Sequence, residues 1–186
     1  MDNPLVIILV VALIAVIGVA AWLYLQKRRT EELRTSFGPE YDRAVREHED
    51  KSKAERVLEE RKERVEQLHI RPLPDEDRER FAEHWRSVQA QFVDDPAGAT
   101  READRLVGEV MQARGYPVGD FEQRAADVSV NHPRVVQHYR AAHGIALRHE
   151  RSEAGTEDLR QAMVHYRALF EDLLEVDAPA PREVRR

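Results

Sequence analysis

The sequence predicts an all-α protein with a single N-terminal transmembrane helix, a charged connecting helix, and a small bundle of four to five amphipathic helices. Three observations lead to this fold class. Residues 5–25 are apolar and carry no charge. The residues that follow, to about position 72, are dense in acidic and basic side chains. Beyond them, apolar residues recur at the spacing of one helix face, and no run shows the alternation of a strand.

The apolar run PLVIILVVALIAVIGVAAWLYL is predicted to be a retained membrane anchor. About 21 residues extend roughly 31 Å as a helix, which matches the hydrocarbon core of a bilayer. A cleaved signal peptide has a basic N-terminal region, whereas the flank here carries Asp2 and no Lys or Arg. We therefore expect residues 1–4 to form a short extracytoplasmic N-terminus and residues 5–25 to span the membrane once.

The end of this run predicts the orientation of the anchor. Lys27, Arg28 and Arg29 follow it directly, and nothing basic precedes it. Such cations favour the cytoplasmic side and attract anionic lipid headgroups. Trp22 and Tyr24 are residues typical of the membrane interface. The sequence therefore predicts a cytoplasmic C-terminal domain, with an exported domain as the alternative topology.

Residues 26–39 are expected to form a basic juxtamembrane segment, and residues 40–72 a charged helix. Acidic residues stand four positions before basic ones, and such pairs stabilise an exposed helix by a few tenths of a kcal/mol each. Only the end of this helix has the apolar spacing of a coiled coil, so a homo-oligomer is possible but not favoured. We expect a solvated helix whose C-terminal half packs on the following domain.

Residues 73–176 are predicted to form the bundle, and residues 177–186, rich in Pro and charge, a disordered tail. Asp95 and Pro96 have the pattern of a helix start, and Gly115 that of a helix end. The predicted core positions are Phe81, Trp85, Val88, Phe92, Ala99, Ala103, Leu106, Val107, Val110, Met111, Val135, Val136, Tyr139, Ala142, Ile145, Leu159, Ala162, Met163, Tyr166, Leu169, Phe170, Leu173 and Leu174.

Composition excludes several kinds of chemistry. The chain has no cysteine, which rules out disulfides, thiol nucleophiles and Cys-ligated metals. Its net charge of −6 argues against nucleic-acid binding. No phosphate-binding glycine motif is present. The sequence predicts no catalytic, cofactor-binding or metal-binding residue. The alternative is a metal-dependent or other enzyme whose site is assembled between helices, from residues such as His84, Asp94 and His138.

One stretch, MQARGYPVGDFEQRAADVSVNHP, differs from its surroundings because it concentrates glycines, prolines and aromatics. Tyr116, Pro117 and Phe121 are the candidate recognition surface, since loops on helical scaffolds often carry binding residues. The alternative is that the two aromatic rings are core residues that tie the helices together. We expect a division: Phe121 in the core, and Tyr116 partly exposed with its hydroxyl at the surface.

The segments SFGPEYDRAV, RPLPDEDRERF, WRSVQAQFVDDPAGA, VMQARGYPVGDFEQRAADVSVNHPRVVQHYR and TEDLRQAMVHYRALFEDLL resemble a family of small bacterial proteins labelled hypothetical, membrane or secreted proteins. The resemblance implies a bacterial origin and, for the anchor, the inner membrane. It implies no activity, cofactor or site residue. The sequence as a whole favours a membrane-tethered, non-enzymatic interaction module with an unidentified protein partner.

Overall fold

The computed structural model describes the backbone of residues 4–174 and the side chains of residues 12–174. The predicted tail, residues 177–186, and most of the predicted extracytoplasmic N-terminus lie outside these residues. Within them the chain forms eight helices and no strand, which confirms the all-α fold class. The chain divides into two compact units, Met1–Leu58 and Glu59–Arg186.

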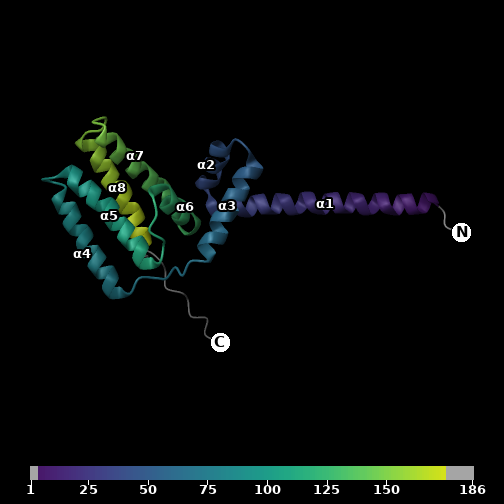
Figure 1. Ribbon diagram of the computed structural model, residues 1–186, viewed down its shortest axis with the longest axis horizontal. Coiled ribbons are helices and arrows are strands. Elements are labelled where there is room, and N and C mark those ends of the chain that lie inside the picture. Colours follow the sequence, from purple (N-terminus) through teal and green to yellow (C-terminus); the bar gives the residue numbers. More distant parts are fainter. Residues whose placement is uncertain (1–3, 175–186) are drawn as a thin grey trace. The chain divides into compact units, whose positions relative to one another are not determined.

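The first unit begins with α1 (Pro4–Phe37), an unbroken helix that contains the apolar run and also most of the segment predicted as juxtamembrane (Figure 1). It ends at Gly38, whose φ of 49° lies in the left-handed region, and Pro39 occupies the first position of α2 (Pro39–His48). The helix α3 (Lys51–Glu66) follows. Its first half belongs to the first unit and its second half to the second.

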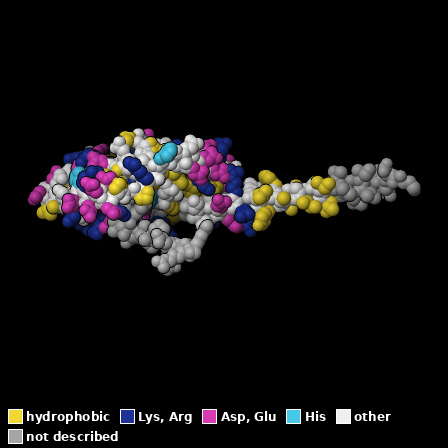
Figure 2. All heavy atoms as spheres, turned by 90° about the horizontal axis from the view of Figure 1, so that it is seen from below, with side chains coloured by type: hydrophobic (Ala, Val, Ile, Leu, Met, Phe, Trp, Pro, Cys, Tyr) yellow, Lys and Arg dark blue, Asp and Glu magenta, His cyan; other side chains and the backbone are white. Residues whose placement is uncertain are grey.

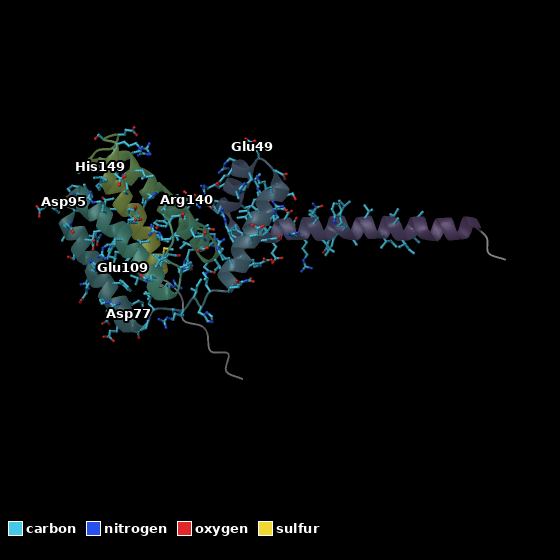
Figure 3. All side chains as sticks on the ribbon, in the orientation of Figure 1. Glu49, Asp77, Asp95, Glu109, Arg140 and His149 are labelled. Carbon is cyan, nitrogen blue, oxygen red and sulfur yellow. The ribbon has the colours of Figure 1, made fainter. Side chains whose placement is uncertain are left out.

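The prediction of one charged helix over residues 40–72 is wrong, because the chain turns between α2 and α3. Glu49, labelled in Figure 3, adopts a left-handed φ of 55° and donates its backbone N–H to the carbonyl of Val45. Asp50 then accepts hydrogen bonds from the first amides of α3. The turn brings two short helices together, and the buried apolar residues of the unit are Leu33, Phe37, Tyr41, Ala44, Ala54 and Leu58. Burying such side chains outweighs exposed ion pairs worth a few tenths of a kcal/mol.

Glu55 joins the three helices of the first unit. Its Oε1 accepts hydrogen bonds from Thr30 Oγ1 of α1 and from the Tyr41 hydroxyl of α2, both at 2.8 Å. Lys51 lies one turn away, with Nζ 3.7 Å from the same oxygen. The carboxylate is 8% exposed, and burial of this group is tolerated because it is hydrogen-bonded on two sides. The end of α1 is thereby fastened to a folded helix pair.

The second unit contains α4 (Asp75–Gln91), α5 (Pro96–Arg114), α6 (Phe121–Asn131), α7 (Val136–Glu150) and α8 (Thr156–Leu173). The helix α8 packs against both α5 and α7, while α4 covers α5 and α6 covers α7 (Figure 1). The predicted starts and stops hold: Asp95 accepts a hydrogen bond from the Gly98 amide, and Gly115 ends α5 with a φ of 100°. These five helices confirm the predicted bundle.

The core of the second unit follows the predicted stripes. Every predicted core residue is buried except Phe92 and Val135, which are partly buried against it. Trp85 of α4 stacks on Phe170 of α8 with ring centroids 4.7 Å apart. The helix α5 therefore contributes its small and branched side chains between larger ones from α4 and α8.

This unit begins earlier than the predicted boundary at residue 73. Leu68 and Ile70 pack against its core, and the Arg71 amide donates a hydrogen bond to the carbonyl of Arg114. Arg64 of α3 donates hydrogen bonds from Nε and Nη2 to Asp127 of α6, at 2.9 and 2.7 Å. The prediction placed the boundary at the prolines after His69, but the chain keeps contact with the bundle across them.

Candidate functional site

The described part of α1 exposes apolar side chains on every side. All residues from Ala12 to Arg29 are exposed, and Figure 2 shows hydrophobic side chains along this helix, with Lys and Arg where the run ends. Trp22 and Tyr24 are 61% and 66% exposed. Among the residues whose side chains are described, no helix has the apolar length needed to cross a bilayer. Residues 5–11 of the predicted span lie outside that set.

The five predicted interface residues, Trp22, Tyr24, Lys27, Arg28 and Arg29, occupy two successive turns of α1. The Lys27 ammonium lies 3.9 Å from a Glu31 oxygen, and both side chains are largely exposed. An exposed pair of this kind contributes little to stability, so the ammonium stays accessible to other anions. Along α1 the two aromatic residues precede the three basic ones.

Tyr116 is not part of an exposed surface, which corrects the sequence-based prediction. Its side chain is 2% exposed, and its hydroxyl accepts a hydrogen bond from Asn131 Nδ2 at 3.1 Å. Burial raises the pKa of this phenol. The turn is held tightly, since a Cβ added at Gly115 would lie 2.6 Å from the backbone oxygen of His69. No local pattern in the sequence indicated that Tyr116 would be buried.

Phe121 is the more exposed of the two rings, so the predicted division is reversed. It is partly buried and stacks on the His143 imidazole with centroids 3.6 Å apart, and it meets Tyr139 at 4.8 Å. Pro117 is exposed beside it. The candidate recognition surface therefore reduces to Pro117 and the outer edge of Phe121, with Val118 75% exposed between them.

A partly buried polar cluster lies near this ring, and no pattern in the sequence indicated it. Arg124 of α6 and Asp104 of α5 approach to 3.6 Å. The hydroxyls of Tyr139 and Tyr166 are buried, and neither has a hydrogen-bond partner of good geometry among the described residues. Burial and then the nearby Asp104 carboxylate raise the pKa of both phenols, so both stay neutral. Burial likewise lowers the pKa of His143.

This cluster is best understood as part of the core. Asp104 and Arg124 offset each other's charge where α5 and α6 face the two tyrosines, and a paired arrangement costs less than an isolated buried charge. A neutral phenol beside a carboxylate can donate a hydrogen bond to it, and it does not act as a base. The sequence signal was weak, because Asp104 and Arg124 are single polar residues on otherwise ordinary helices.

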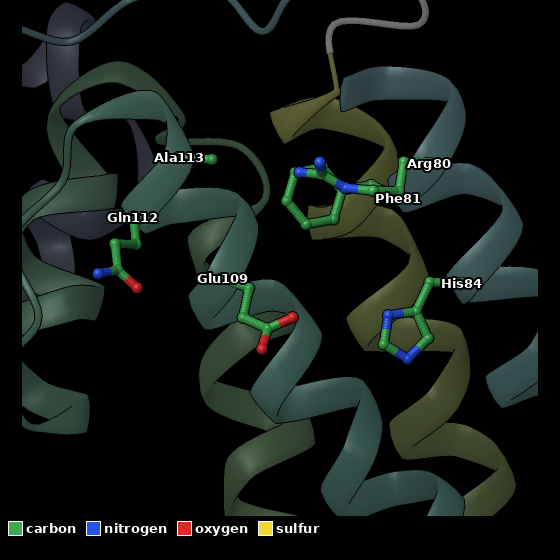
Figure 4. Close-up of a pocket in the computed structure, with 6 residues that line it drawn as sticks. All are labelled: Arg80, Phe81, His84, Glu109, Gln112 and Ala113. Carbon is green, nitrogen blue, oxygen red and sulfur yellow. The ribbon is translucent and has the colours of Figure 1, made fainter. Parts of the chain in front are cut away.

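A concave surface of the second unit is a shallow groove of about 410 Å³ between α4 and α5. Figure 4 shows Arg80 and His84 on α4 across from Glu109 on α5, while the Gln112 side chain, also on α5, points away from α4. The guanidinium of Arg80 lies over the Phe81 ring, 5.1 Å from its centroid, which is a cation–π distance.

The polar groups beside this groove form a chain of ion pairs. His84 Nε2 lies 2.9 Å from a Glu102 oxygen, and Arg105 contacts both Glu102 and Glu109. The hydrogen bonds from Arg105, ahead of those from His84, lower the pKa of Glu102. These side chains form hydrogen bonds with one another, which fixes their positions beside the groove. The aromatic ring that lines the groove is Phe81.

The residues named for the alternative enzyme hypothesis do not form one site. His84 faces Glu102 on α5, Asp94 is exposed in the turn after α4, and His138 on α7 faces His165 on α8, with 2.9 Å between the Nδ1 atoms. No group of three or more His, Asp or Glu side chains in the described part of the chain has the geometry to hold a metal ion.

No protein-family model, curated protein or solved structure matches this chain. The resemblance to small bacterial membrane proteins therefore stays an expectation.

Proposed function

We propose that this protein is a single-pass, membrane-tethered interaction module. In this proposal α1 crosses the bacterial inner membrane, and the remaining helices form a non-enzymatic domain in the cytoplasm that binds a protein partner. The observation that carries the proposal is the continuous exposure of α1, from Ala12 to Arg29, on all sides of the helix.

The exposed apolar surface of α1 is unfavourable in water and is expected to be buried in another environment. Its large apolar residues are each more than half exposed: Leu13, Ile14, Val16, Ile17, Val19, Trp22, Leu23, Tyr24 and Leu25. Burying one such side chain is worth about 1.5–3 kcal/mol, so together they represent more than about 10 kcal/mol. A partner protein would cover one face of a helix, whereas hydrocarbon covers all of them. A bilayer is therefore the environment that this helix fits best.

The charges that follow support the cytoplasmic placement of the domain. Lys27, Arg28 and Arg29 come directly after the apolar run. Cations in this position hold their end of a span on the cytoplasmic side, and each contributes about 1 kcal/mol of attraction to an anionic leaflet.

In this proposal the anchor has to be joined firmly to a folded part of the protein, and Glu55 makes such a connection. It links Thr30 near the end of the predicted membrane segment to Tyr41 of α2. The helix α1 is thus held to α2 and α3 by hydrogen bonds rather than by a flexible linker.

We place the protein partner at the α4–α5 groove. Arg and aromatic residues carry much of the energy of protein interfaces, and Arg80 with Phe81 supplies both at a concave surface. Beside the groove, Glu102 is already engaged by His84 and Arg105.

The membrane part of the proposal is tested by extraction and topology. The full-length protein should stay with membranes after alkaline carbonate washing. A phosphatase fused after Arg34 should be inactive, and a fluorescent protein at the same point should be bright. Release by carbonate would overturn the anchor, and an active phosphatase fusion would overturn the orientation in favour of the exported alternative.

The partner part is tested separately in membranes from the native host. A photo-crosslinking amino acid in place of Gln112 in the groove should give a discrete adduct, one that Arg80→Glu removes. The matched control is the same amino acid in place of Glu157, which is exposed on α8. Equal adducts at both positions, or none at Gln112, would contradict a binding site in the groove.

A further inference from the structure

Two histidines from neighbouring helices face each other on the surface of the second unit. His138 is on α7 and His165 is on α8, 27 positions apart in the sequence. Their Nδ1 atoms are 2.9 Å apart, and their ring centroids are 5.1 Å apart with an angle of 33° between the planes. In the metal-free pair one imidazole donates an N–H to the lone pair of the other.

This arrangement differs from that of other histidines in the unit. His84 lies against a carboxylate, His132 contacts Asp172, and His149 Nδ1 lies 2.9 Å from the carbonyl oxygen of Ala154. An imidazole that faces a carboxylate or a carbonyl is oriented as a donor. Only where nitrogen faces nitrogen can two lone pairs be turned toward a common point.

The surroundings leave the pair open to solvent ions. His138 is exposed and His165 is partly buried. Three positions further along each helix stand the small residues Ala141 and Ala168, and four positions before the histidines stand Arg134 and Gln161, both exposed.

The two nitrogens are close enough to bind one metal ion. With metal–nitrogen bonds of about 2.05 Å, two ligands at 90° lie about 2.9 Å apart, and two ligands at the tetrahedral angle about 3.35 Å apart. The observed 2.9 Å is the length of the hydrogen bond between the two rings, and a small side-chain movement reaches either value, so the order of metals rests on imidazole affinity, which peaks at Cu²⁺. Square-planar and octahedral nitrogen sites are typical of Cu²⁺ and Ni²⁺, whereas Zn²⁺ prefers the tetrahedral angle.

We propose that His138 and His165 form a two-histidine site for a divalent late transition metal, Cu²⁺ or Ni²⁺ ahead of Zn²⁺, that links α7 to α8. Because no third protein ligand is near in the described residues, water completes the coordination. Mg²⁺ and Ca²⁺ do not bind, since they require oxygen ligands. Ion binding stabilises the folded unit, because the site exists only when α7 and α8 are packed.

The test uses the full-length protein without a histidine tag, in detergent micelles. Isothermal titration with NiCl₂ should show one site, and the melting temperature should rise with Ni²⁺ but not with Mg²⁺. His138→Ala and His165→Ala should each weaken Ni²⁺ binding by about tenfold or more, because one imidazole is left. The matched control is His149→Ala, also on α7, which should bind Ni²⁺ as the native protein does.

A spectroscopic measurement keeps the result independent of any loss of stability. Electron paramagnetic resonance of the Cu²⁺ complex should show two equatorial nitrogens in the native protein, and one in either single variant that retains the native circular dichroism. Should His165→Ala fail to fold, His138→Gln at the exposed position decides. Native affinity in the His138 and His165 variants, or no Ni²⁺ or Cu²⁺ binding by the native protein, would overturn the proposal.

Discussion

Replacing Arg64 with alanine should destabilise the second unit, although Arg64 lies outside the predicted bundle. The Arg64 side chain is 41% exposed, but its acceptor, the Asp127 carboxylate, is 1% exposed. The substitution removes two charge-assisted hydrogen bonds from Arg64. The Asp127 carboxylate then keeps the hydrogen bonds from Gln123 Nε2, which lies 2.9 and 3.0 Å from its two oxygens. Hydrogen bonds to a charged group contribute about 1.5–3 kcal/mol, and partial exposure of Arg64 reduces this, so we expect a loss of about 2 kcal/mol.

The measurement is a thermal melt of the full-length protein, followed by near-ultraviolet circular dichroism of the buried Trp85. A loss of about 2 kcal/mol corresponds to a melting temperature lower by about 8 °C for a unit of this size. The matched control is Arg160→Ala, which removes an exposed pair with Glu157 and should leave the melting temperature nearly unchanged. Equal shifts for the two variants would refute the reasoning that Asp127 depends on Arg64.

Three further predictions follow from burial. Tyr116→Ala should cost about 3 kcal/mol or more because it leaves a cavity, and Phe121→Ala clearly less; equal losses in denaturant melts would contradict the assignment. Burial and the acceptor Glu55 raise the pKa of Tyr41 from 10.0 to about 12. The stability supplied by its neutral phenol is complete below pH 10 and lost as pH rises through about 12, so Tyr41→Phe should melt with a weaker alkaline dependence than the native protein. A fragment of residues 59–174 should melt cooperatively and higher than one of residues 73–174, because the shorter lacks the contacts before residue 73; identical melts would restore the predicted boundary.

Much of the bundle could be predicted because its signals are local. The Asp95 cap and the Gly115 stop depend on backbone groups within a few residues, and the helical stripes depend on a spacing of three or four positions. The turn at Glu49 could not be predicted, since no Gly or Pro marks it. It exists because burying both helices of the pair is worth more than continuing one exposed helix.

The candidate sites show the same contrast. The apolar run and the cations after it are contiguous, so the proposal of a membrane anchor rests on sequence alone and needs only the exposure of α1 as support. Buried Tyr116 accepts a hydrogen bond from Asn131, which stands 15 positions along the chain. The groove needs α4 and α5 side by side, and so its lining was missed.

By itself, then, the sequence determined the all-α class, the core stripes and the ends of several helices, because each follows from interactions within a turn or two of the chain. Tertiary structure alone decided that Arg64 meets Asp127 and that His138 meets His165, pairs 63 and 27 residues apart. The sequence does not indicate which distant residue a charged side chain or a histidine will contact. Their pairing is set by how the apolar faces pack, since burial of those faces supplies most of the free energy and positions the polar groups that lie between them.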